Sequence, residues 1–326
     1  MGQLSDGRSR GRSRGHRRLR RAAIGLVVVA VSITGCSAGY NALTVPATAP
    51  PRSLSRGPFV EAAGVLTRYQ RWGTTGSPIV LVGGFLEPTS VWERVAPLLA
   101  RHHRVYALDL AGFGYSERVG TFSLAAWSDQ LRAFLRELSI ERPILVGHSL
   151  GAGVVAEVAR QNPELVRGIV LADGDARRGG AGVPGWVRDL LVDPFRTSLI
   201  RLALGSDLVV RSVLHEVYGP HRPPIDAREL DRWRRPFRVE GTEQALAVMA
   251  SREIPGLDLG EIGQITTPAM LIWGDHDSSV SLASGRTTAA ALHAPITIVP
   301  GGGHLAMLTD PVPFAAAIDR FASAQR

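Results

Sequence analysis

The chain has 326 residues, of which 45% are hydrophobic and 20% are charged, so its composition is that of a folded protein and not of a disordered one. Its net charge of +8 would suit a nucleic-acid partner, but residues 1–21 hold eight arginines and one aspartate and therefore almost all of that excess. The rest of the chain is nearly neutral, and we expect no nucleic-acid partner. A single cysteine, Cys36, excludes an internal disulfide.

The N-terminal segment has the features of an export leader followed by a tether. An apolar run at 22–35 follows the arginines, as in a signal sequence, and we expect the arginines to stay inside. The stretch "ITGC" resembles the lipobox of bacterial lipoproteins, which implies lipidation of Cys36. A signal-anchor helix that extends towards Val45 and an ordinary cleaved signal peptide are the alternatives. All three predict an exported protein, held at the membrane in the first two, with a leader or anchor at 1–36 and a Pro- and Ser-rich tether at 37–58.

Strands and helices alternate over most of the remaining chain. Alternating residues predict a hairpin at 59–73, with Gly64 at the turn. Continuous apolar runs predict strands buried on both faces at 78–84, 104–110, 143–149, 168–174, 269–275 and 295–301. Amphipathic segments predict helices at 90–101, 124–138, 150–163, 281–292 and 311–324. This alternation indicates an α/β fold with a mostly parallel central sheet flanked by helices.

One long segment interrupts the alternation. Residues 176–262 contain several short helical pieces and no sheet-like run, which predicts an all-helical cap over the C-terminal ends of the strands. The core then divides into a first part at 59–175 and a second part at 263–326. The large apolar side chains of the cap either line a pocket for an apolar acyl group or only pack the cap onto the core: Trp186, Phe195, Leu202, Tyr218 and Trp233.

The stretch "ILVGHSLGAG" places Ser149 between a predicted strand and a predicted helix. Gly147 and Gly151 provide the small residues that so tight a turn requires. From these residues alone, the serine is either a nucleophile or a small turn residue. The pattern strand, G-x-S-x-G, helix resembles the nucleophile elbow of the α/β-hydrolase family, and the likeness covers about residues 59–324. This resemblance implies the α/β-hydrolase fold and a catalytic role for the serine.

A nucleophilic serine needs a base, and the base needs a carboxylate that orients it. The segment "GHLAMLTDP" resembles the family's G-H-x-x-x-x-[DE]-x-P pattern, which implies that His304 is the base. "WGDHD" resembles the family's W-G-x-x-D segment, which implies that Asp277 is the acid. Asp275 is an alternative acid, and so is Asp173 or Asp175, because some members of the fold carry the acid after that earlier strand.

The tetrahedral intermediate needs two hydrogen-bond donors for its oxyanion. The resemblance assigns this role to the backbone N–H groups of Leu150 and Phe85. The family usually has His-Gly in the loop before Phe85, where this chain has Gly83-Gly84. His148 lies inside the elbow, and we expect it to shape the pocket.

Other motifs narrow the chemistry. "DLAGFGYS" at 109–116 resembles a segment of the family that we interpret as structural, so Asp109 is not a catalytic candidate. A serine at the elbow argues against the members that open epoxides or displace halide, which carry an aspartate there. The sequence has no metal-ligand cluster, no phosphate-binding loop and no dinucleotide fingerprint, so we expect neither a metal nor a cofactor.

The sequence thus predicts a serine hydrolase, carboxylesterase- or lipase-like and of class EC 3.1.1, that acts on a small-molecule ester through an acyl-enzyme. Hydrolysis of a carbon–carbon bond in a diketone-type substrate by the same triad is the first alternative, and amide, thioester and lactone cleavage also remain open. A non-catalytic, envelope-anchored binding protein is the alternative from another class. Such a protein would keep its role when Ser149 is replaced by alanine, whereas a hydrolase would not.

Overall fold

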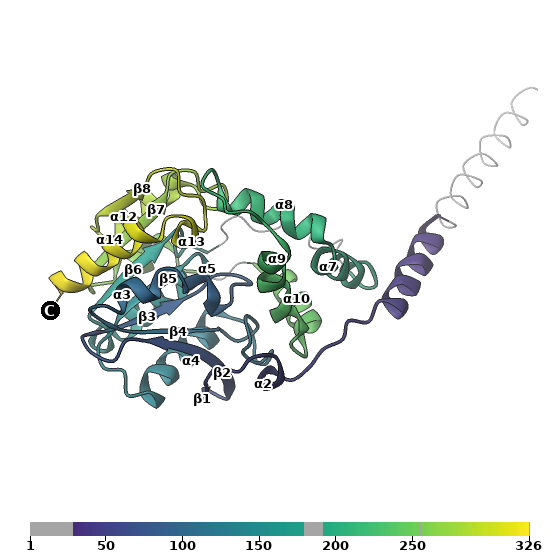
Figure 1. The fold of residues 1–326 in the computed structure, drawn as a ribbon, viewed down its shortest axis with the longest axis horizontal. Helices are drawn as coiled ribbons and strands as arrows, with labels where there is room; N and C mark the ends of the chain where they lie inside the picture. Colours follow the sequence, from purple (N-terminus) through teal and green to yellow (C-terminus); the bar gives the residue numbers. More distant parts are fainter. Residues whose placement is uncertain (1–28, 179–191, 254–255, 326) are drawn as a thin grey trace, which may run out of the picture.

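The computed structural model describes residues 29–178, 192–253 and 256–325. Its centre is an eight-stranded sheet in the order β1-β2-β4-β3-β5-β6-β7-β8, as Figure 1 shows. β1 and β2 pair antiparallel to each other, and β2 pairs antiparallel to β4, whereas the other neighbours pair in parallel. The predicted mostly parallel sheet is therefore confirmed. The strands are β1 (Phe59–Ala62), β2 (Val65–Trp72), β3 (Pro78–Val82), β4 (Arg104–Leu108), β5 (Ile144–His148), β6 (Gly168–Ala172), β7 (Ala269–Gly274) and β8 (Ile296–Val299).

Helices cover both faces of the sheet, because side chains alternate across each strand. Val80 and Val82 of β3 belong to a core with α4 (Leu124–Glu137), α5 (Leu150–Gln161) and α12 (Leu282–Ala291). Ile79 and Leu81 of the same strand face the opposite way, into a core with α3 (Ala96–Leu99) and α14 (Pro311–Ala324). β3, β5 and β6 are thus buried on both faces, as their composition predicts, whereas the edge strand β8 is only partly buried.

The segment predicted as one helix at 90–101 is two short pieces instead. A 3-10 helix, η1 (Thr89–Trp92), precedes the four-residue helix α3. Pro97 lies in the first turn of α3, where backbone N–H groups make no hydrogen bond within the helix, so the lack of an N–H in proline costs nothing there. In one continuous helix the same proline would remove a hydrogen bond from the middle, and the chain therefore divides there.

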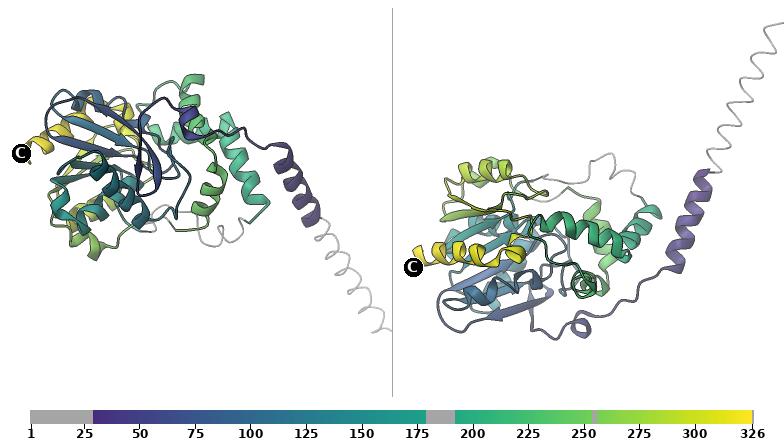
Figure 2. Two further views of the ribbon diagram at one scale, coloured as in Figure 1. Left: turned by 90° about the horizontal axis from the view of Figure 1, so that it is seen from below. Right: turned by 45° about the horizontal axis from the view of Figure 1, so that its top comes forward.

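The cap lies between β6 and β7 in the sequence and at one end of the sheet in space (Figure 2). The predicted pieces at 179–191, including Trp186, lie outside the described residues, as does the leader at 1–28. The described elements of this segment are α7 (Phe195–Gly205), α8 (Asp207–Tyr218), α9 (Ala227–Arg234), η3 (Arg235–Arg238), α10 (Thr242–Ala250) and α11 (Leu259–Gly263).

The helix at the start of the described chain and the segment that follows it contact the cap. A helix at 29–43 leads in from the N-terminus. Its Asn41 side chain donates to the carbonyl of Pro194 at 2.8 Å, and its Ser37 hydroxyl lies 2.6 Å from that of Ser198 on α7. Further along, Ala49 pairs with Val239, the residue after η3, before the short helix α2 (Pro51–Leu54). Among the helices of the described residues, none has both the length and the apolar composition that crossing a bilayer requires.

Candidate active site

Ser149 occupies a strained turn between β5 and α5. Its backbone has φ +50° and ψ −118°, a combination that L-residues rarely adopt. The turn is fixed by the hydrogen bond from the Ser149 N–H to the carbonyl of Ala172 in β6, at 3.0 Å. This backbone puts the hydroxyl side chain at the C-terminal end of β5, where it lines a cavity. An unfavourable φ at a polar side chain in a cavity is typical of a functional site.

The two elbow glycines are needed for close approach. A Cβ on Gly147 would lie 2.3 Å from the carbonyl oxygen of Gly151. A Cβ on Gly151 would in turn lie 2.5 Å from the carbonyl oxygen of Val82, at the end of β3. Since both distances are below any van der Waals contact, a larger residue at either position would push α5 away from the sheet. The G-x-S-x-G spacing therefore follows from how closely this helix approaches β3 and β5.

His304 and Asp277 form a buried hydrogen-bonded pair beside this turn. The Nδ1 of His304, after β8, lies 2.9 Å from Oδ2 of Asp277, after β7. The other carboxylate oxygen of Asp277 accepts the backbone N–H groups of Ser279 and Val280, at 2.8 and 3.0 Å. The backbone thus fixes Oδ1 of the carboxylate, and Oδ2 faces the imidazole of His304. Ser149 and His304 line the same cavity, although no hydrogen bond joins their side chains in the described chain.

The three alternative acids make other contacts. Asp275 bonds the His276 ring and the N–H of Gly301, while Asp175 bonds Ser284 and the N–H of Arg177. Asp173 is fully buried and accepts the N–H of Gly274 at 2.7 Å, and its second oxygen has no partner among the described residues. Burial, together with the charge of Asp277, raises the pKa of Asp173 well above its usual range. Of the four carboxylates, the structure brings Asp277 to the histidine.

The two expected oxyanion donors flank Ser149. Leu150 is the first residue of α5, so its N–H points out of the helix end and adds to the positive end of the helix dipole. Phe85 follows Gly84 in the loop after β3, with its ring edge against Phe113 at a centroid distance of 5.4 Å. Neither N–H donates to another protein group in the described part of the chain. A Cβ on Gly84 would lie 2.7 Å from the Cβ of Ser149, so this loop runs directly against the serine.

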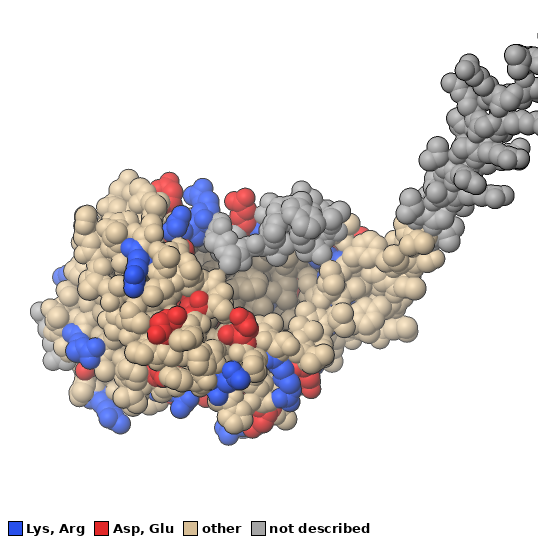
Figure 3. Space-filling view, turned by 90° about the horizontal axis from the view of Figure 1, so that it is seen from above, with Lys and Arg blue, Asp and Glu red and all other residues tan. Residues whose placement is uncertain are grey.

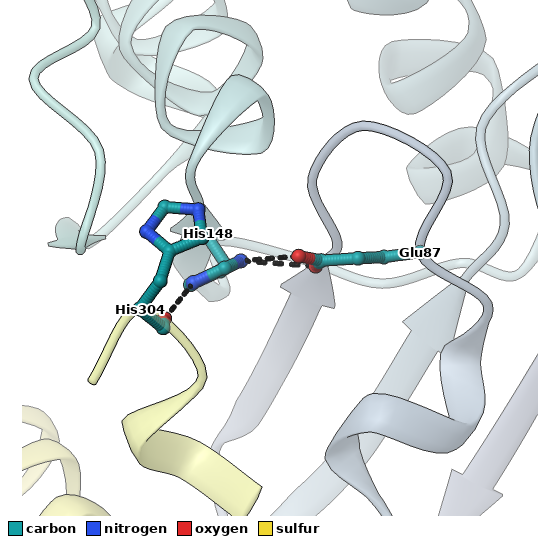
Figure 4. A group of neighbouring side chains, drawn as sticks. All are labelled: Glu87, His148 and His304. Carbon is teal, nitrogen blue, oxygen red and sulfur yellow. Dashed lines mark hydrogen bonds and ion pairs between the residues drawn. The ribbon is translucent and has the colours of Figure 1, made fainter. Parts of the chain in front are cut away.

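A buried ion pair that the sequence did not predict lies behind the elbow. Figure 4 shows Glu87 and His148 facing each other, with 2.9 Å between a carboxylate oxygen and Nδ1. The Nε2 of His148 lies 2.7 Å from the backbone oxygen of His304. No local pattern marks Glu87, since a single acidic residue in a loop after a strand is usually a surface residue.

Glu87, His148 and His304 also form the one group of three potential metal-ligand side chains within the described residues. The ligand atoms of Glu87 and His148 already bond to each other, and the second nitrogen of His148 bonds a carbonyl. A metal would have to displace both contacts. The group therefore fits a hydrogen-bond network better than a metal site.

The cavity at the elbow has a volume of about 460 Å³ and lies between the sheet and the cap. Its wall towards the cap is apolar, with side chains from α8 and α9. Trp233 lines it, whereas Tyr218 is buried against Glu229 and Leu202 points to the surface. Arg177 is the one arginine among the described lining residues, which include no lysine. The α8 residues that line the cavity are Val209, Val210, Val213, Leu214 and Val217.

Asp109 has the structural contacts that its motif predicts. It is fully buried, and its carboxylate oxygens accept the backbone N–H groups of Thr89 and Tyr115 at 2.5 and 2.7 Å. It does not contact the cavity-lining serine or histidine. These bonds close the loop after β4 and tie it to η1.

Comparison with known proteins finds relatives that cover most of the chain. A family described as alpha/beta hydrolase fold matches residues 77–311 of the chain. An uncharacterized hydrolase of Bacillus subtilis, YugF, is 29% identical over 234 residues, which are 70% of this chain and 84% of YugF. A 2-hydroxy-6-oxo-6-(2'-aminophenyl)hexa-2,4-dienoic acid hydrolase of Metapseudomonas resinovorans is 27% identical over 277 residues, 81% of this chain and 90% of that protein.

Solved structures share the same architecture. A membrane phospholipase A described as a bacterial virulence factor superposes with a TM-score of 0.68 and 24% identity, over 95% of this chain and 99% of that one. The enol-lactonase of Burkholderia xenovorans LB400 superposes with a TM-score of 0.66 and 21% identity, over 82% and 100% of the two chains. At these identities the likeness shows the fold.

Proposed function

The chain is a hydrolase that belongs to the α/β-hydrolase family, and we propose that within this family it cleaves a carboxylic ester through a serine nucleophile. One observation carries the proposal. The strained serine at the β5–α5 turn and His304, which is hydrogen-bonded to Asp277, line one apolar cavity. Serine, histidine and carboxylate in these positions are the parts that acyl transfer to a serine requires.

In the proposed reaction, the Ser149 oxygen attacks the ester carbonyl while Nε2 of His304 takes its proton. Asp277 holds the N–H at Nδ1 of His304, which leaves Nε2 free to accept. The N–H groups of Phe85 and Leu150 then donate to the oxyanion of the tetrahedral intermediate. His304 returns the proton to the leaving alcohol, and an acyl-enzyme remains. A water molecule, deprotonated by His304, attacks this ester, and His304 then returns the proton to the Ser149 oxygen as the bond to the acyl group breaks and the acid is released.

The cavity supports an apolar acyl group or ring as the part of the substrate held by the enzyme. Five aliphatic side chains of α8 and the ring of Trp233 line the cavity together with Ser149. Burial of apolar surface contributes about 0.8 kcal/mol per CH₂ group. Lengthening an aliphatic acyl chain should therefore lower KM until the wall is reached.

Carbon–carbon bond hydrolysis by the same triad is the second candidate. Curated relatives named for the hydrolysis of 2-hydroxymuconate semialdehyde and of an aminophenyl oxo-dienoic acid favour it. A carboxylate-bearing substrate would need a cation, and Arg177 is the arginine that lines the cavity. This candidate predicts that Arg177→Met removes the activity, whereas hydrolysis of an uncharged ester should change little.

Labelling of the full chain with a fluorophosphonate, together with rates on short- and long-chain p-nitrophenyl esters, tests the proposal. We expect the wild type to be labelled at Ser149 alone and to hydrolyse the esters. Ser149→Ala should be neither labelled nor active. Ser116→Ala is the matched control, because this buried serine bonds the carbonyl of Asp109 away from the cavity. A folded wild-type protein that is neither labelled nor active would refute a serine hydrolase and favour the binding protein.

We also propose that the protein is exported and held at a membrane by its N-terminal segment, with the cap next to the lipid. The helix at 29–43 has no charged residue, and Figure 3 shows its surface without charge. It is hydrogen-bonded to α7, whose Leu199 and Leu202 are half exposed, and Leu208 of α8 is 74% exposed. Cys36 is exposed on the same helix and open to lipidation. The apolar cap surface and the N-terminal segment therefore lie at the same end of the protein.

Fractionation of cells that express the full chain tests this location. We expect the wild type in the membrane fraction, with Cys36→Ser released if lipid attachment is the anchor and retained if the apolar run spans the membrane. Flotation with liposomes tests the cap: Leu202→Ser with Leu208→Ser should reduce binding. Leu165→Ser makes the same replacement at an exposed leucine remote from the cap, and it should not reduce liposome binding. Wild-type protein in the soluble fraction would contradict the proposal.

A further inference from the structure

Three loops of the proposed active site meet at the side chain of His148. It is fully buried, with Glu87 at Nδ1 and the backbone oxygen of His304 at Nε2. Both partners are oxygen acceptors. A neutral imidazole has one N–H and one lone pair, and so it can satisfy only one of two acceptors. With Glu87 ionised, the geometry therefore requires an imidazolium, with a proton on each nitrogen.

The charges around His148 agree with this protonation state. Burial, which disfavours a charge, is the largest influence, but the charge and hydrogen bond of Glu87 outweigh it and raise the pKa of His148 to about 9. Asp173, at the end of β6, adds to the rise. The ring centroid of His304 lies 4.7 Å from that of His148. The uncharged ring of Trp92 packs against His148 in an edge-to-face arrangement. At neutral pH the side chain is thus a cation paired with a carboxylate.

Glu87, the acidic member of the pair, reaches the proposed oxyanion loop. A carboxylate oxygen of Glu87 accepts the backbone N–H of Gly84 at 2.6 Å. Gly84 precedes the proposed donor Phe85 and runs against Ser149. The hydrogen-bonded series from Gly84 through Glu87 and His148 to His304 therefore connects the oxyanion loop to the backbone of the proposed base. Figure 4 shows the part of this series from Glu87 to His304.

We propose that Glu87 and His148 are positioning residues, which hold the loops of Gly84 and His304 against Ser149 while His148 carries both ring protons. This inference rests on the proposed serine-hydrolase function. It attributes the fall of kcat at high pH to deprotonation of His148, and not to a change in the triad of Ser149, His304 and Asp277. Neither residue exchanges a proton with the substrate.

The pH dependence follows from the two acceptors. A group whose pKa is raised in the folded protein keeps its proton below that pKa and loses it as the pH rises. Above about pH 9, His148 would present a lone pair either to the carboxylate of Glu87 or to the carbonyl of His304. Two acceptors at 2.7–2.9 Å repel each other, so one loop moves away and kcat falls.

Two substitutions of Glu87 give opposite expectations. In Glu87→Gln the amide oxygen can accept the Gly84 N–H, and the amide NH₂ can donate to Nδ1 of a neutral His148, which still donates to His304. The positions are kept without a charge, so the alkaline fall near pH 9 should disappear while kcat at neutral pH stays within about tenfold of the wild type. Glu87→Ala removes both contacts, and kcat should fall by about 10²-fold or more with a small change in KM.

The experiment compares kcat and KM of the full chain on a p-nitrophenyl ester between about pH 6 and pH 10. Glu117→Gln is the matched control, because Glu117 also accepts a backbone N–H, that of Leu66 at 2.8 Å, outside the cavity. We expect wild type and control to share the alkaline fall that Glu87→Gln lacks. An unchanged fall in Glu87→Gln, or wild-type kcat in Glu87→Ala, would overturn the proposal, since a merely structural role moves stability but not the pH profile.

A second measurement does not depend on activity. In ¹⁵N spectra of the histidine rings of full-length Ser149→Ala at pH 7, with the signal assigned by His148→Asn, both nitrogens of His148 should be protonated. A neutral His148 overturns the inference whatever the rates are. An active wild type with a neutral His148 refutes the positioning role alone, whereas a folded wild type that is neither labelled nor active refutes the proposed function itself.

Discussion

Replacement of Asp277 by asparagine should inactivate the proposed enzyme without disturbing its fold. The amide has one accepting oxygen, and two backbone N–H groups, those of Ser279 and Val280, already require an acceptor at this side chain. The oxygen must therefore stay with them, and the NH₂ must face Nδ1 of His304. Nδ1 then accepts and Nε2 carries the hydrogen, so the imidazole presents a donor towards Ser149 where the reaction needs a base.

The size of the effect follows from this change of tautomer. A serine hydrolase whose histidine is held in the wrong tautomer loses about 10⁴-fold in kcat. At about 1.4 kcal/mol per tenfold, this corresponds to about 5.5 kcal/mol in the activation free energy. KM should change little, because Asp277 is not among the described residues that line the cavity. The free energy of unfolding should change little as well, since every hydrogen bond of the carboxylate has an equivalent in the amide.

Steady-state rates on a p-nitrophenyl ester and the rate of fluorophosphonate labelling measure the loss. Asp275→Asn is the matched control, because its carboxylate is close in sequence but bonds His276 and Gly301. It should keep near wild-type kcat. A kcat of Asp277→Asn within tenfold of the wild type would refute the assignment of the acid, and a loss in Asp173→Asn at the same time would transfer the role to Asp173.

Three further outcomes follow. Asp173→Asn should keep kcat within about threefold, because burial raises the pKa of Asp173 and so favours its protonated form, which Asn copies. Since the folded state binds this proton more tightly, the wild type should lose stability relative to Asp173→Asn as the pH rises above about 4, which urea unfolding at pH 4 and pH 8 measures. Gly84→Ala should lower kcat by about 10²–10³-fold, because its Cβ would lie 2.7 Å from that of Ser149 and displace the oxyanion loop; Gly64→Ala, where a Cβ meets nothing within 4 Å, is its control for activity. Phe314→Ala, fully buried between α14 and the sheet, should cost about 3–5 kcal/mol of unfolding free energy and leave kcat unchanged, and equal stability would contradict the packing.

The sequence predicted the sheet and most of its flanking helices because their signals are local. Each buried strand is a continuous apolar run, and α4 and α14 agree with their predicted bounds within a residue or two. Ser149 could be placed because it follows β5 directly, whereas Asp277 and His304 lie in the loops after β7 and β8, where the resemblance to family segments indicated them. The exception is the segment at 90–101, where apolar spacing indicated one helix and Pro97 divided it.

The network behind the elbow could not be predicted in the same way. Glu87 and His148 are 61 residues apart, and the partner at the other nitrogen, the carbonyl of His304, is a backbone atom with no sequence signal. Choosing among the four aspartates from the residues alone left alternatives open, because two of them follow β6 and two follow β7. The contacts that separate them are loop hydrogen bonds, which depend on how the loops pack and not on periodicity.

The backbone of Ser149 sets a limit on how stable this protein can be while it keeps its nucleophile. A non-glycine residue at φ +50° and ψ −118° costs about 1–3 kcal/mol, and the surrounding hydrogen bonds and packing must compensate for it. Alanine at this position keeps the cost, whereas glycine removes it, so Ser149→Gly should unfold at a higher temperature than Ser149→Ala. A selection for thermostability alone would therefore favour loss of the serine. Directed evolution of more robust variants would need to retain turnover as a second criterion, or gain its stability in parts of the fold remote from this turn.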